Sequence, residues 1–263
     1  HYCGNTIPSP RKCPHCGSYS FTYGAPGTQK IEQNLKILFP EAKILRMDSD
    51  SARKRDTYKS MYNRMKNREV DILLGTQMIS KGLDFPLVTL VGIVMADISL
   101  NLPDFRAAER TFQLLTQVAG RSGRRDKIGE VIIQTYNPEH YSIVSASQQN
   151  YILFATEELG YRKKLYYPPY YRLARILFQS PNLELLKKEL PNIHEAADKL
   201  HKQFPVPQLF LLGPAPAPFS KISSYYRYHL IFKAQTVTVL QEAIRQFNSA
   251  YNCPSHIRKQ IDI

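Results

Sequence analysis

The stretch Asp71-Ile72-Leu73-Leu74-Gly75-Thr76-Gln77-Met78-Ile79-Ser80-Lys81-Gly82-Leu83-Asp84-Phe85-Pro86 decides the fold. It begins with a short apolar strand, residues 71–74, and a glycine-threonine turn then opens a helix. Such a turn exposes backbone N–H groups and a hydroxyl, which suit an anion. Taken by itself, Gly75-Thr76 is equally a plain helix N-cap. The stretch therefore predicts a β-α unit, with Gly75 and Thr76 as candidates for a phosphate contact.

Strands and helices alternate on both sides of this unit. Apolar strands are predicted at 18–23, 42–47, 88–95 and 129–136. Helices are predicted from Gly27, over 51–68 and from Phe105, and the first has Ile31, Leu35 and Leu38 on one face. This alternation is typical of an α/β fold with a parallel sheet.

A second motif ends the helical pattern that begins at Phe105. Residues 117–124 have the sequence Gln-Val-Ala-Gly-Arg-Ser-Gly-Arg, so Arg121 and Arg124 lie in a glycine-punctuated turn. Arginine stays charged and presents a planar fork of donors to phosphate oxygens. A solvated basic turn is the alternative for a lone Gly-Arg pair. The full pattern instead favours two arginines that sense the γ-phosphate of a nucleotide during phosphoryl transfer.

The cysteines cluster near the amino terminus. Cys13-Pro14-His15-Cys16-Gly17 has the form of a zinc knuckle, in which two thiolates on a tight turn grip one tetrahedral metal ion. A buried disulfide is the alternative, but a C-x-x-C pair in an intracellular protein more often binds metal or does redox work. Cys3 adds a third thiol, and His1 or His15 could supply a fourth ligand. Cys253 is assigned no role.

The composition favours a polyanionic partner. The chain of 263 residues carries 35 Lys and Arg against 22 Asp and Glu, a net charge of +13. Basic charge alone fits solubility or a membrane surface equally well. However, no apolar run approaches the ~20 residues that span a bilayer, and no signal peptide is visible. We expect an intracellular protein with nucleic acid as its partner.

The order and the residues of these motifs resemble those of a known family. Gly75–Pro86 and Gln117–Arg124 are similar to motifs V and VI of superfamily 2 helicases, and with the cysteine pair they resemble the PriA family of replication-restart DNA helicases, also called primosomal protein N′. The resemblance covers nearly the whole chain and implies a RecA-like second helicase lobe. Site roles follow for a small set of residues: Arg121 and Arg124 at the γ-phosphate, Gln117 beside them, Gly82 and Asp84 in nucleotide coupling, and Gly75 and Thr76 on the DNA strand.

The resemblance also implies a motor that is incomplete in this chain. No Walker A loop and no DExH-like motif is present, so the cradle for ATP and Mg would lie on a preceding lobe, and this C-terminal fragment alone would be inactive. The longer protein would bind two zinc ions through four C-x-x-C pairs. Cys3, Cys13 and Cys16 would then belong to incomplete sites that hold zinc weakly or not at all.

The implied activity is 3′ to 5′ unwinding of DNA and recognition of stalled forks in the bacterial cytoplasm, associated with the nucleoid. The implied partners are single-stranded and forked DNA, a single-strand-binding protein and primosome proteins, with no membrane. Two alternatives stay open: a non-enzymatic nucleic-acid module with a zinc knuckle, and a different superfamily 2 motor. The first leaves both motifs unexplained, and the cysteine pairs count weakly against the second.

The last third of the chain predicts a separate unit. A helical pattern runs from Tyr141 to about Leu165 and is ended by Pro168-Pro169. The predicted elements that follow are strand 172–179, helix 183–204, strands 208–212 and 225–232, helix 237–250 and strand 257–263. This β-α-β-β-α-β order is ferredoxin-like, and the resemblance likens the unit to a ribosomal S-ten protein. The expected divisions are 1–24 (partial zinc module), 25–148 (helicase lobe), 149–170 (helical linker) and 171–263.

Two stretches mix basic and aromatic side chains, residues 161–167 and residues 219–228. Stacking combined with phosphate contacts is the chemistry of single-strand or fork binding. With 17 tyrosines in the chain, packing is the better explanation for any one ring. Lys221 and Arg227 remain candidates for binding DNA or the acidic tail of a single-strand-binding protein.

Overall fold

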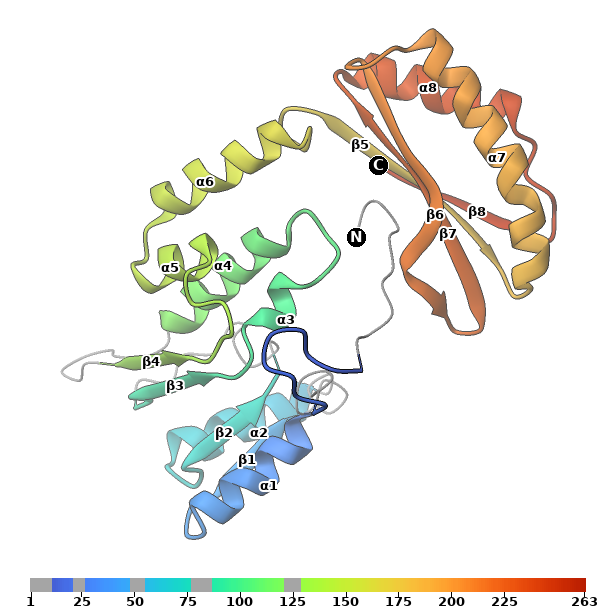
Figure 1. The fold of residues 1–263 in the computed structure, drawn as a ribbon. Helices are drawn as coiled ribbons and strands as arrows, with labels where there is room; N and C mark the ends of the chain where they lie inside the picture. The colour runs from blue at the N-terminus through green and yellow to red at the C-terminus, as the bar shows by residue number, and fades with distance from the viewer. Residues whose placement is uncertain (1–10, 21–26, 48–54, 77–86, 121–128) are drawn as a thin grey trace. The chain divides into compact units, whose positions relative to one another are not determined.

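The computed structural model describes residues 11–20, 27–47, 55–76, 87–120 and 129–263. The chain divides into two compact units, Pro10–Thr156 and a second unit that contains Glu157–Ile263. Figure 1 labels the helices and strands of both units. The fold is a mixed α/β fold, as the alternation of strands and helices predicts.

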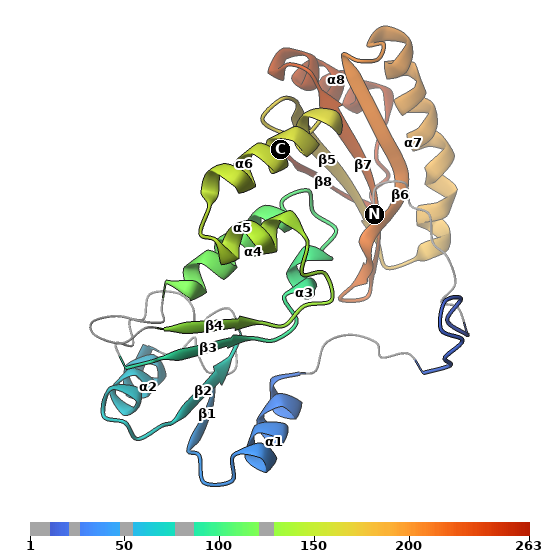
Figure 2. The ribbon, with the colours of Figure 1, turned by 60° about the vertical axis from the view of Figure 1, so that its left-hand side comes forward.

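The first unit contains two pairs of parallel strands among its described residues (Figure 2). β1 (Ile44–Met47) pairs with β2 (Ile72–Gly75), and β3 (Leu90–Ile93) pairs with β4 (Glu130–Ile133). Each lies within a predicted strand or one residue beyond it. The predicted strand at 18–23 is absent from residues 18–20, and residues 21–23 lie outside the described chain.

Two helices contact the strands β1 and β2. α1 (Thr28–Leu38) contacts β1 and β2, and its Glu32 accepts a hydrogen bond from Arg46 of β1 at 2.7 Å. α2 (Arg55–Lys66) buries Met61 against Met47 of β1. Both helices lie inside their predicted ranges, and residues 51–54 of the second lie outside the described chain.

A second apolar cluster joins the helices that flank β4. α4 (Ala107–Ala119), α5 (Tyr141–Ser147) and α6 (Tyr151–Lys164) bury Phe112, Leu115, Ile143 and Phe154 together. The rings of Phe112 and Phe154 stack with centroids 4.3 Å apart. The short helix α3 (Asp97–Leu100), which the sequence did not predict, packs against α4.

The single predicted helix from Tyr141 to about Leu165 is wrong. The structure breaks it into α5 and α6 at residues 148–150, where Gln149 adopts φ +50°. Asn150 then starts α6, because its side chain accepts a hydrogen bond from Leu153 N at 3.0 Å. The break falls in a polar run, Ser147-Gln148-Gln149-Asn150, between the apolar residues of the two helices.

The second unit is a four-stranded antiparallel sheet with two long helices. Its elements are β5 (Arg172–Ser180), α7 (Leu183–Gln203), β6 (Leu209–Ile222), β7 (Tyr225–Ala234), α8 (Val237–Ala250) and β8 (Arg258–Asp262). The strands lie in the order β6-β7-β5-β8. The observed order of elements, β-α-β-β-α-β, confirms the predicted order.

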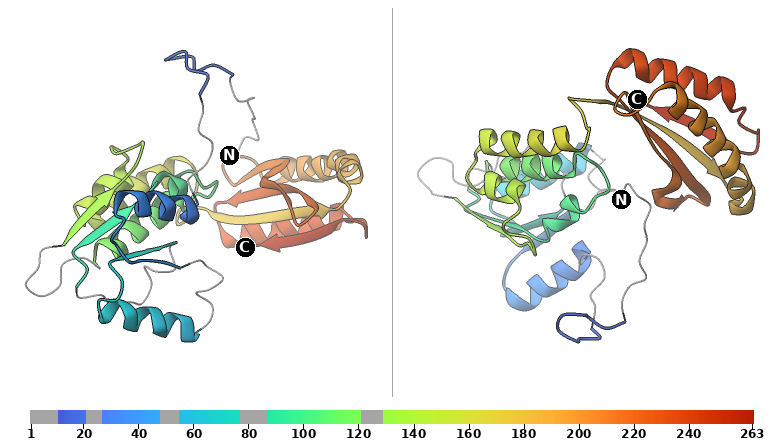
Figure 3. Two further views of the ribbon diagram at one scale, coloured as in Figure 1. Left: turned by 90° about the horizontal axis from the view of Figure 1, so that it is seen from below. Right: turned by 45° about the horizontal axis from the view of Figure 1, so that its top comes forward.

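Both helices of the second unit cover one face of its sheet (Figure 3). Asn182 and Thr236 begin them as N-caps, and their side chains accept hydrogen bonds from backbone N–H groups two or three residues on. The core between helices and sheet includes the fully buried Phe178, Phe232 and Phe247.

β6 is much longer than the strand predicted at 208–212. The residues beyond the predicted strand include Gly213, Pro214, Pro216 and Pro218, and proline donates no hydrogen bond to a neighbouring strand. The prediction was wrong because β6 is an edge strand, where the proline nitrogen, which has no N–H, can face away from the neighbouring strand. The pairing of β6 with β7 changes register twice, after Leu212 and after Pro216. These shifts accommodate the irregular stretch of β6.

Candidate nucleotide-sensing and nucleic-acid-binding sites

Gly75 and Thr76 lie at the carboxyl end of β2. Gly75 stands opposite Met47 in the parallel register, so β1 and β2 end at the same edge. Thr76 follows directly and is exposed. Ligands of α/β sheets bind beyond the carboxyl ends of the strands. Both residues are therefore placed where a phosphate contact is possible, whereas Gly82 and Asp84 lie outside the described residues.

Gln117 lies in the last turn of α4, next to the arginine motif. It is half-buried and sits about 200° around the helix from the buried Leu115, away from the core. Gly120 ends the helix, and its N–H donates to Thr116 O at 3.1 Å. Arg121 and Arg124 lie outside the described residues. α4 ends at Ala119, directly before the arginine motif, as the sequence predicts.

Asp97 is a residue that the sequence reasoning missed. Only 7% of it is exposed, and its carboxylate accepts hydrogen bonds from Thr135 Oγ1 at 2.9 Å and from Tyr136 N at 3.0 Å. These bonds tie the chain beyond β3 to the chain beyond β4. Asp97 thereby fixes the carboxyl edge of this strand pair. An aspartate directly after an apolar strand was the available signal.

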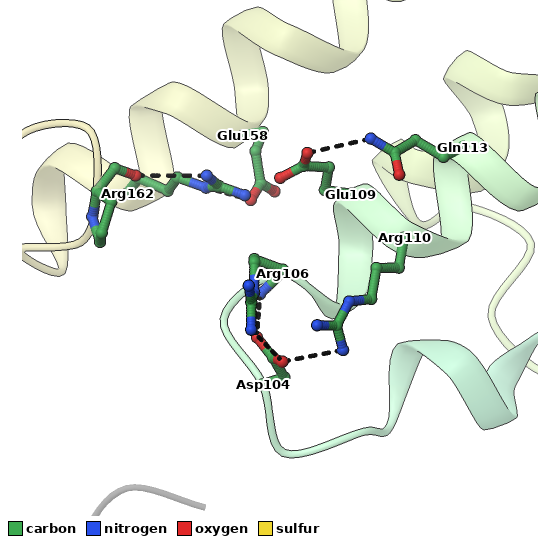
Figure 4. Close-up of polar contacts among 8 residues, drawn as sticks. Asp104, Arg106, Glu109, Arg110, Gln113, Glu158 and Arg162 are labelled. Atoms are coloured by element: carbon green, nitrogen blue, oxygen red, sulfur yellow. Dashed lines mark hydrogen bonds and ion pairs between the residues drawn. The ribbon is translucent and has the colours of Figure 1, made fainter. Parts of the chain in front are cut away.

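The start of α4 carries a cluster of one carboxylate and two guanidinium groups (Figure 4). Asp104 binds Arg106 at 3.1 Å and Arg110 at 2.9 Å. Burial acts to raise the pKa of Asp104, but the hydrogen bonds from Arg106 and the charges of both arginines outweigh it and lower the pKa. Arg110 and Gln117 are seven residues apart, hence on the same side of α4.

The pair Cys13 and Cys16 forms a tight turn. Gly17 N donates to Cys13 O at 3.0 Å, and Gly17 adopts φ +70°, which a side chain would disfavour. Hydrogen bonds from the backbone of Cys16 and of His15 lower the pKa of the Cys13 thiol. The turn therefore suits a thiolate ligand. Within the described part of the chain, no three His, Cys, Asp or Glu residues come together as a metal site, and Cys3 lies outside it.

Lys221 and Arg227 lie on opposite faces of the hairpin formed by β6 and β7. Lys221 Nζ stands 4.5 Å from the ring centroid of its cross-strand partner Tyr226, which packs on the helix-covered face. Arg227 is the next residue along β7, so its side chain points to the other face. The two candidates therefore lie on different faces of the hairpin and would act separately.

The face of the sheet opposite α7 and α8 is polar near Arg227. Arg175 Nη2 donates to Asp262 Oδ2 at 2.6 Å, and Arg227 Nη1 donates to Phe219 O at 3.3 Å. His229 is only 4% exposed. Burial, with the charges of Arg175 and Arg227, lowers the pKa of His229 to about 4, so the imidazole is neutral near pH 7.

Several residues of the stretch 161–167 serve packing. Arg162 pairs with Glu158 at 2.6 Å within α6 (Figure 4). Lys233 Nζ lies 3.6 Å from the centroid of the Tyr167 ring and donates to Leu165 O at 3.0 Å. Burial lowers the pKa of Lys233 to about 8. These contacts hold the segment after α6 against the sheet of the second unit.

Comparison with known proteins identifies both halves of the chain. A family model described as helicase conserved C-terminal domain matches residues 23–126, and one described as primosomal protein N C-terminal domain matches residues 163–263. No helix in the described ranges is long and apolar enough to cross a membrane.

Curated relatives match nearly the full length of the chain. The replication restart protein PriA of Bacillus subtilis (strain 168) is 41% identical over 251 residues, 95% of this chain and 31% of the relative. The replication restart protein PriA of Treponema pallidum (strain Nichols) is 39% identical over 263 residues, 100% of this chain and 39% of the relative. The chain thus spans roughly a third of the length of these relatives. By these matches, the chain belongs to the family of the replication restart proteins PriA.

Proposed function

We propose that this chain is the part of an ATP-dependent DNA helicase that senses the nucleotide, in a protein that restarts replication at stalled forks. One observation carries the proposal. The match to the helicase C-terminal domain, residues 23–126, contains both Gly75–Pro86 and Gln117–Arg124. The relatives are named for replication restart, which supports the same role.

In the proposed mechanism, the arginine motif at residues 117–124 provides the contacts to the nucleotide. Arg121 and Arg124 follow the end of α4 and contact the γ-phosphate of ATP, where a guanidinium neutralises the charge that develops during phosphoryl transfer. Gln117 assists from the last turn of α4. Gly82 and Asp84 couple the nucleotide state to these arginines. Because the sequence has no Walker A loop, ATP and Mg bind to a second lobe, and this chain alone does not hydrolyse ATP.

In the proposed mechanism, residues at the carboxyl end of β2 provide the contacts to DNA. Thr76 is exposed there, and its hydroxyl and the neighbouring backbone N–H groups hold a phosphate of the tracking strand, with Gly75 allowing close approach. Closure of the lobes on ATP and opening after hydrolysis then move the strand by steps in the 3′ to 5′ direction.

Zinc binds near the amino terminus in the longer protein. The turn at Cys13 and Cys16 supplies two thiolates, half of a tetrahedral site, and Cys3 belongs to the other of two sites. The remaining thiolates come from outside this chain. Zinc fixes the local fold there and takes no part in ATP hydrolysis.

The second unit has a ferredoxin-like fold, similar to a ribosomal S-ten protein. The strand order β8-β5-β7-β6, with both helices on one face, supports this proposal. The unit contributes DNA contacts at the fork. A single-strand-binding protein and primosome proteins are the proposed partners, in the bacterial cytoplasm at the nucleoid.

Unwinding of a fluorescent DNA fork tests the function. The longer protein that carries this chain is expected to separate the strands only with ATP and Mg, and only on a 3′ to 5′ track. Thr76→Ala lowers unwinding several-fold while ATP hydrolysis falls less, because the hydroxyl acts on DNA and not on the nucleotide. Thr238→Ala, which removes an exposed threonine hydroxyl from α8, is the matched control. Strand separation without ATP, or none by the wild type, would contradict the proposal.

A further inference from the structure

A surface pocket lies between α7 and the chain that leaves the C-terminal end of α8. Its volume is about 270 Å³. Pockets that hold drug-sized ligands have roughly 300–1,000 Å³, so this one suits a single side chain or a small ion. Its polar lining comes from Glu189, Asn192, Glu195 and Lys199 of α7 and from Tyr251 and Asn252 after α8.

Tyr251 carries a hydroxyl group that the fold leaves without a partner. Only 4% of the residue is exposed, and its oxygen is buried with no hydrogen-bond partner among the described residues. The ring packs against Phe178 and Phe247, with centroids 5.8 and 5.7 Å away, which holds the hydroxyl in place. A buried phenol usually has a hydrogen-bond partner. This hydroxyl is therefore available to a group that enters the pocket.

Glu189 places a carboxylate close to this hydroxyl. Burial, together with the nearby Cys253 and Glu189, raises the pKa of Tyr251, so the phenol keeps its proton near pH 7. Neither neighbour forms a hydrogen bond with the phenol oxygen. The half-buried Glu189 accepts a hydrogen bond from Asn192 Nδ2 at 3.0 Å and forms no ion pair among the described residues. A partly buried charge without a counter-charge favours binding of a cation.

The other charges around the pocket leave it negative. Lys199 Nζ pairs with Glu195 at 2.8 Å, so its charge is already met. Ala250, the last residue of α8, also lines the pocket, and the last turn of α8 contains no basic residue. The carbonyl groups that end a helix have no intrahelical partners and carry partial negative charge. The pocket therefore attracts a cation, although the chain as a whole has a net charge of +13.

We propose that this pocket binds a guanidinium group, carried by an arginine side chain of a partner protein. A guanidinium has five N–H donors and no acceptor, and the pocket offers it the carboxylate of Glu189, the oxygen of Tyr251 and the amide oxygen of Asn252. Its planar fork pairs with a carboxylate through two hydrogen bonds. An ammonium group has three donors on a compact point charge and suits such separated acceptors less well. The site belongs to the second unit and is independent of the helicase motifs.

Titration of the 263-residue chain with N-acetyl-argininamide, followed by NMR of the backbone amides, tests the site. Saturable shifts are expected for the amides of Tyr251 and Asn252. N-acetyl-citrullinamide has nearly the same shape without the charge and is expected to bind about tenfold more weakly or less. Glu189→Gln is expected to weaken binding of the arginine ligand about tenfold. Glu184→Gln, which removes the same charge from an exposed position of α7, is expected to change binding by less than about twofold.

Tyr251→Phe separates binding from folding, because it removes the hydroxyl and keeps the packed ring. This variant is expected to bind the arginine ligand about threefold more weakly. Its melting temperature is expected to stay the same or to rise, because the variant lacks the buried hydroxyl that has no partner. A lower melting temperature would overturn the inference, since it would show that the hydroxyl is already bonded within the fold.

The ligand series gives further outcomes that decide the matter. Equal binding of the arginine and citrulline ligands, or no saturable shift with either, overturns the inference. Equal binding by Glu189→Gln and Glu184→Gln does the same. Tighter binding of spermidine than of N-acetyl-argininamide also overturns it, because the ligand would then be a free polyamine. Loss of ATP hydrolysis, or its absence, leaves all of these results unchanged.

Discussion

Arg175 and Asp262 form an ion pair across β5 and β8, with Nη2 and Oδ2 2.6 Å apart. Both side chains are about 40% exposed, so the pair contributes little to stability, on the order of 0–1 kcal/mol. Its larger effect is electrostatic. Asp262 neutralises Arg175 on the sheet face opposite α7 and α8, whereas Arg227 and Arg258 of that face form no ion pair among the described residues.

Asp262→Asn should therefore tighten binding of oligo-dT. The change removes the carboxylate that opposes phosphate and releases Arg175 for a second contact. We expect an increase in affinity of about threefold to tenfold at low salt, with a steeper salt dependence. Asp198→Asn on the exposed face of α7 removes an equal charge and should leave affinity nearly unchanged. Weaker binding by Asp262→Asn would show that the ion pair builds the site rather than restrains it.

His229 should make the second unit sensitive to acid. Its folded pKa of about 4 lies below the unfolded value of about 6.5, so between these values the unfolded chain binds a proton that the folded chain does not. Stability is fully present above pH 6.5 and is lost as the pH falls towards 4. In His229→Gln this part of the loss should disappear, whereas the exposed His194→Gln should behave as the wild type. An NMR titration of the His229 ring with a midpoint above 6 would contradict this account.

Gly213 should tolerate no side chain. It adopts φ +104°, and a Cβ there would lie 2.5 Å from His229 O. Gly213→Ala is expected to destabilise the second unit by about 2–4 kcal/mol, through strain and displacement of β6 from β7. Gly160→Ala in α6 is the matched control, because nothing lies within 4 Å of its added Cβ, and it should stabilise by about 0.5–1 kcal/mol. Thermal melts of both variants measure this, and equal effects would refute the argument.

Asp97 should hold the ends of β3 and β4 together. Asp97→Ala leaves Thr135 Oγ1 and Tyr136 N without their acceptor, at a cost of about 1–3 kcal/mol. Hydrogen exchange of the β4 amides should become faster, while exchange in α8 should not change. Unchanged exchange in β4 would mean that the strand pairing does not depend on this carboxylate.

The elements that the sequence predicted best have strong local signals. α8 matches its predicted bounds, Val237–Ala250, since Thr236 caps it and its apolar residues recur at helical spacing. The extension of β6 beyond the predicted residues depends on its position at the edge of the sheet, which is known only from the assembled sheet. The break at Gln149 had a local signal, the polar run Ser147–Asn150, but the positive φ value of Gln149 is known only from the structure.

Some residues of the candidate sites could likewise be predicted from the sequence, whereas others are revealed only by the structure. The two helicase motifs are visible as contiguous residues, and the structure places Gly75, Thr76 and Gln117 at the ends of β2 and α4. The separation of Lys221 from Arg227 follows from strand alternation and could have been predicted. By contrast, the pocket that Glu189 and Tyr251 line joins residues far apart in the sequence, so only the packing of α7 beside α8 reveals it.

The central claim is that Arg121 and Arg124 sense ATP, and DNA-stimulated ATP hydrolysis by the longer protein tests it most directly. Arg124→Ala is expected to lower the rate at saturating ATP by about 10³-fold, as loss of an arginine finger does, with DNA binding nearly unchanged. Arg245→Ala, on the exposed face of α8, is expected to retain the wild-type rate. A rate for Arg124→Ala equal to that of the wild type, or an equal loss of hydrolysis and of DNA binding, would contradict the account.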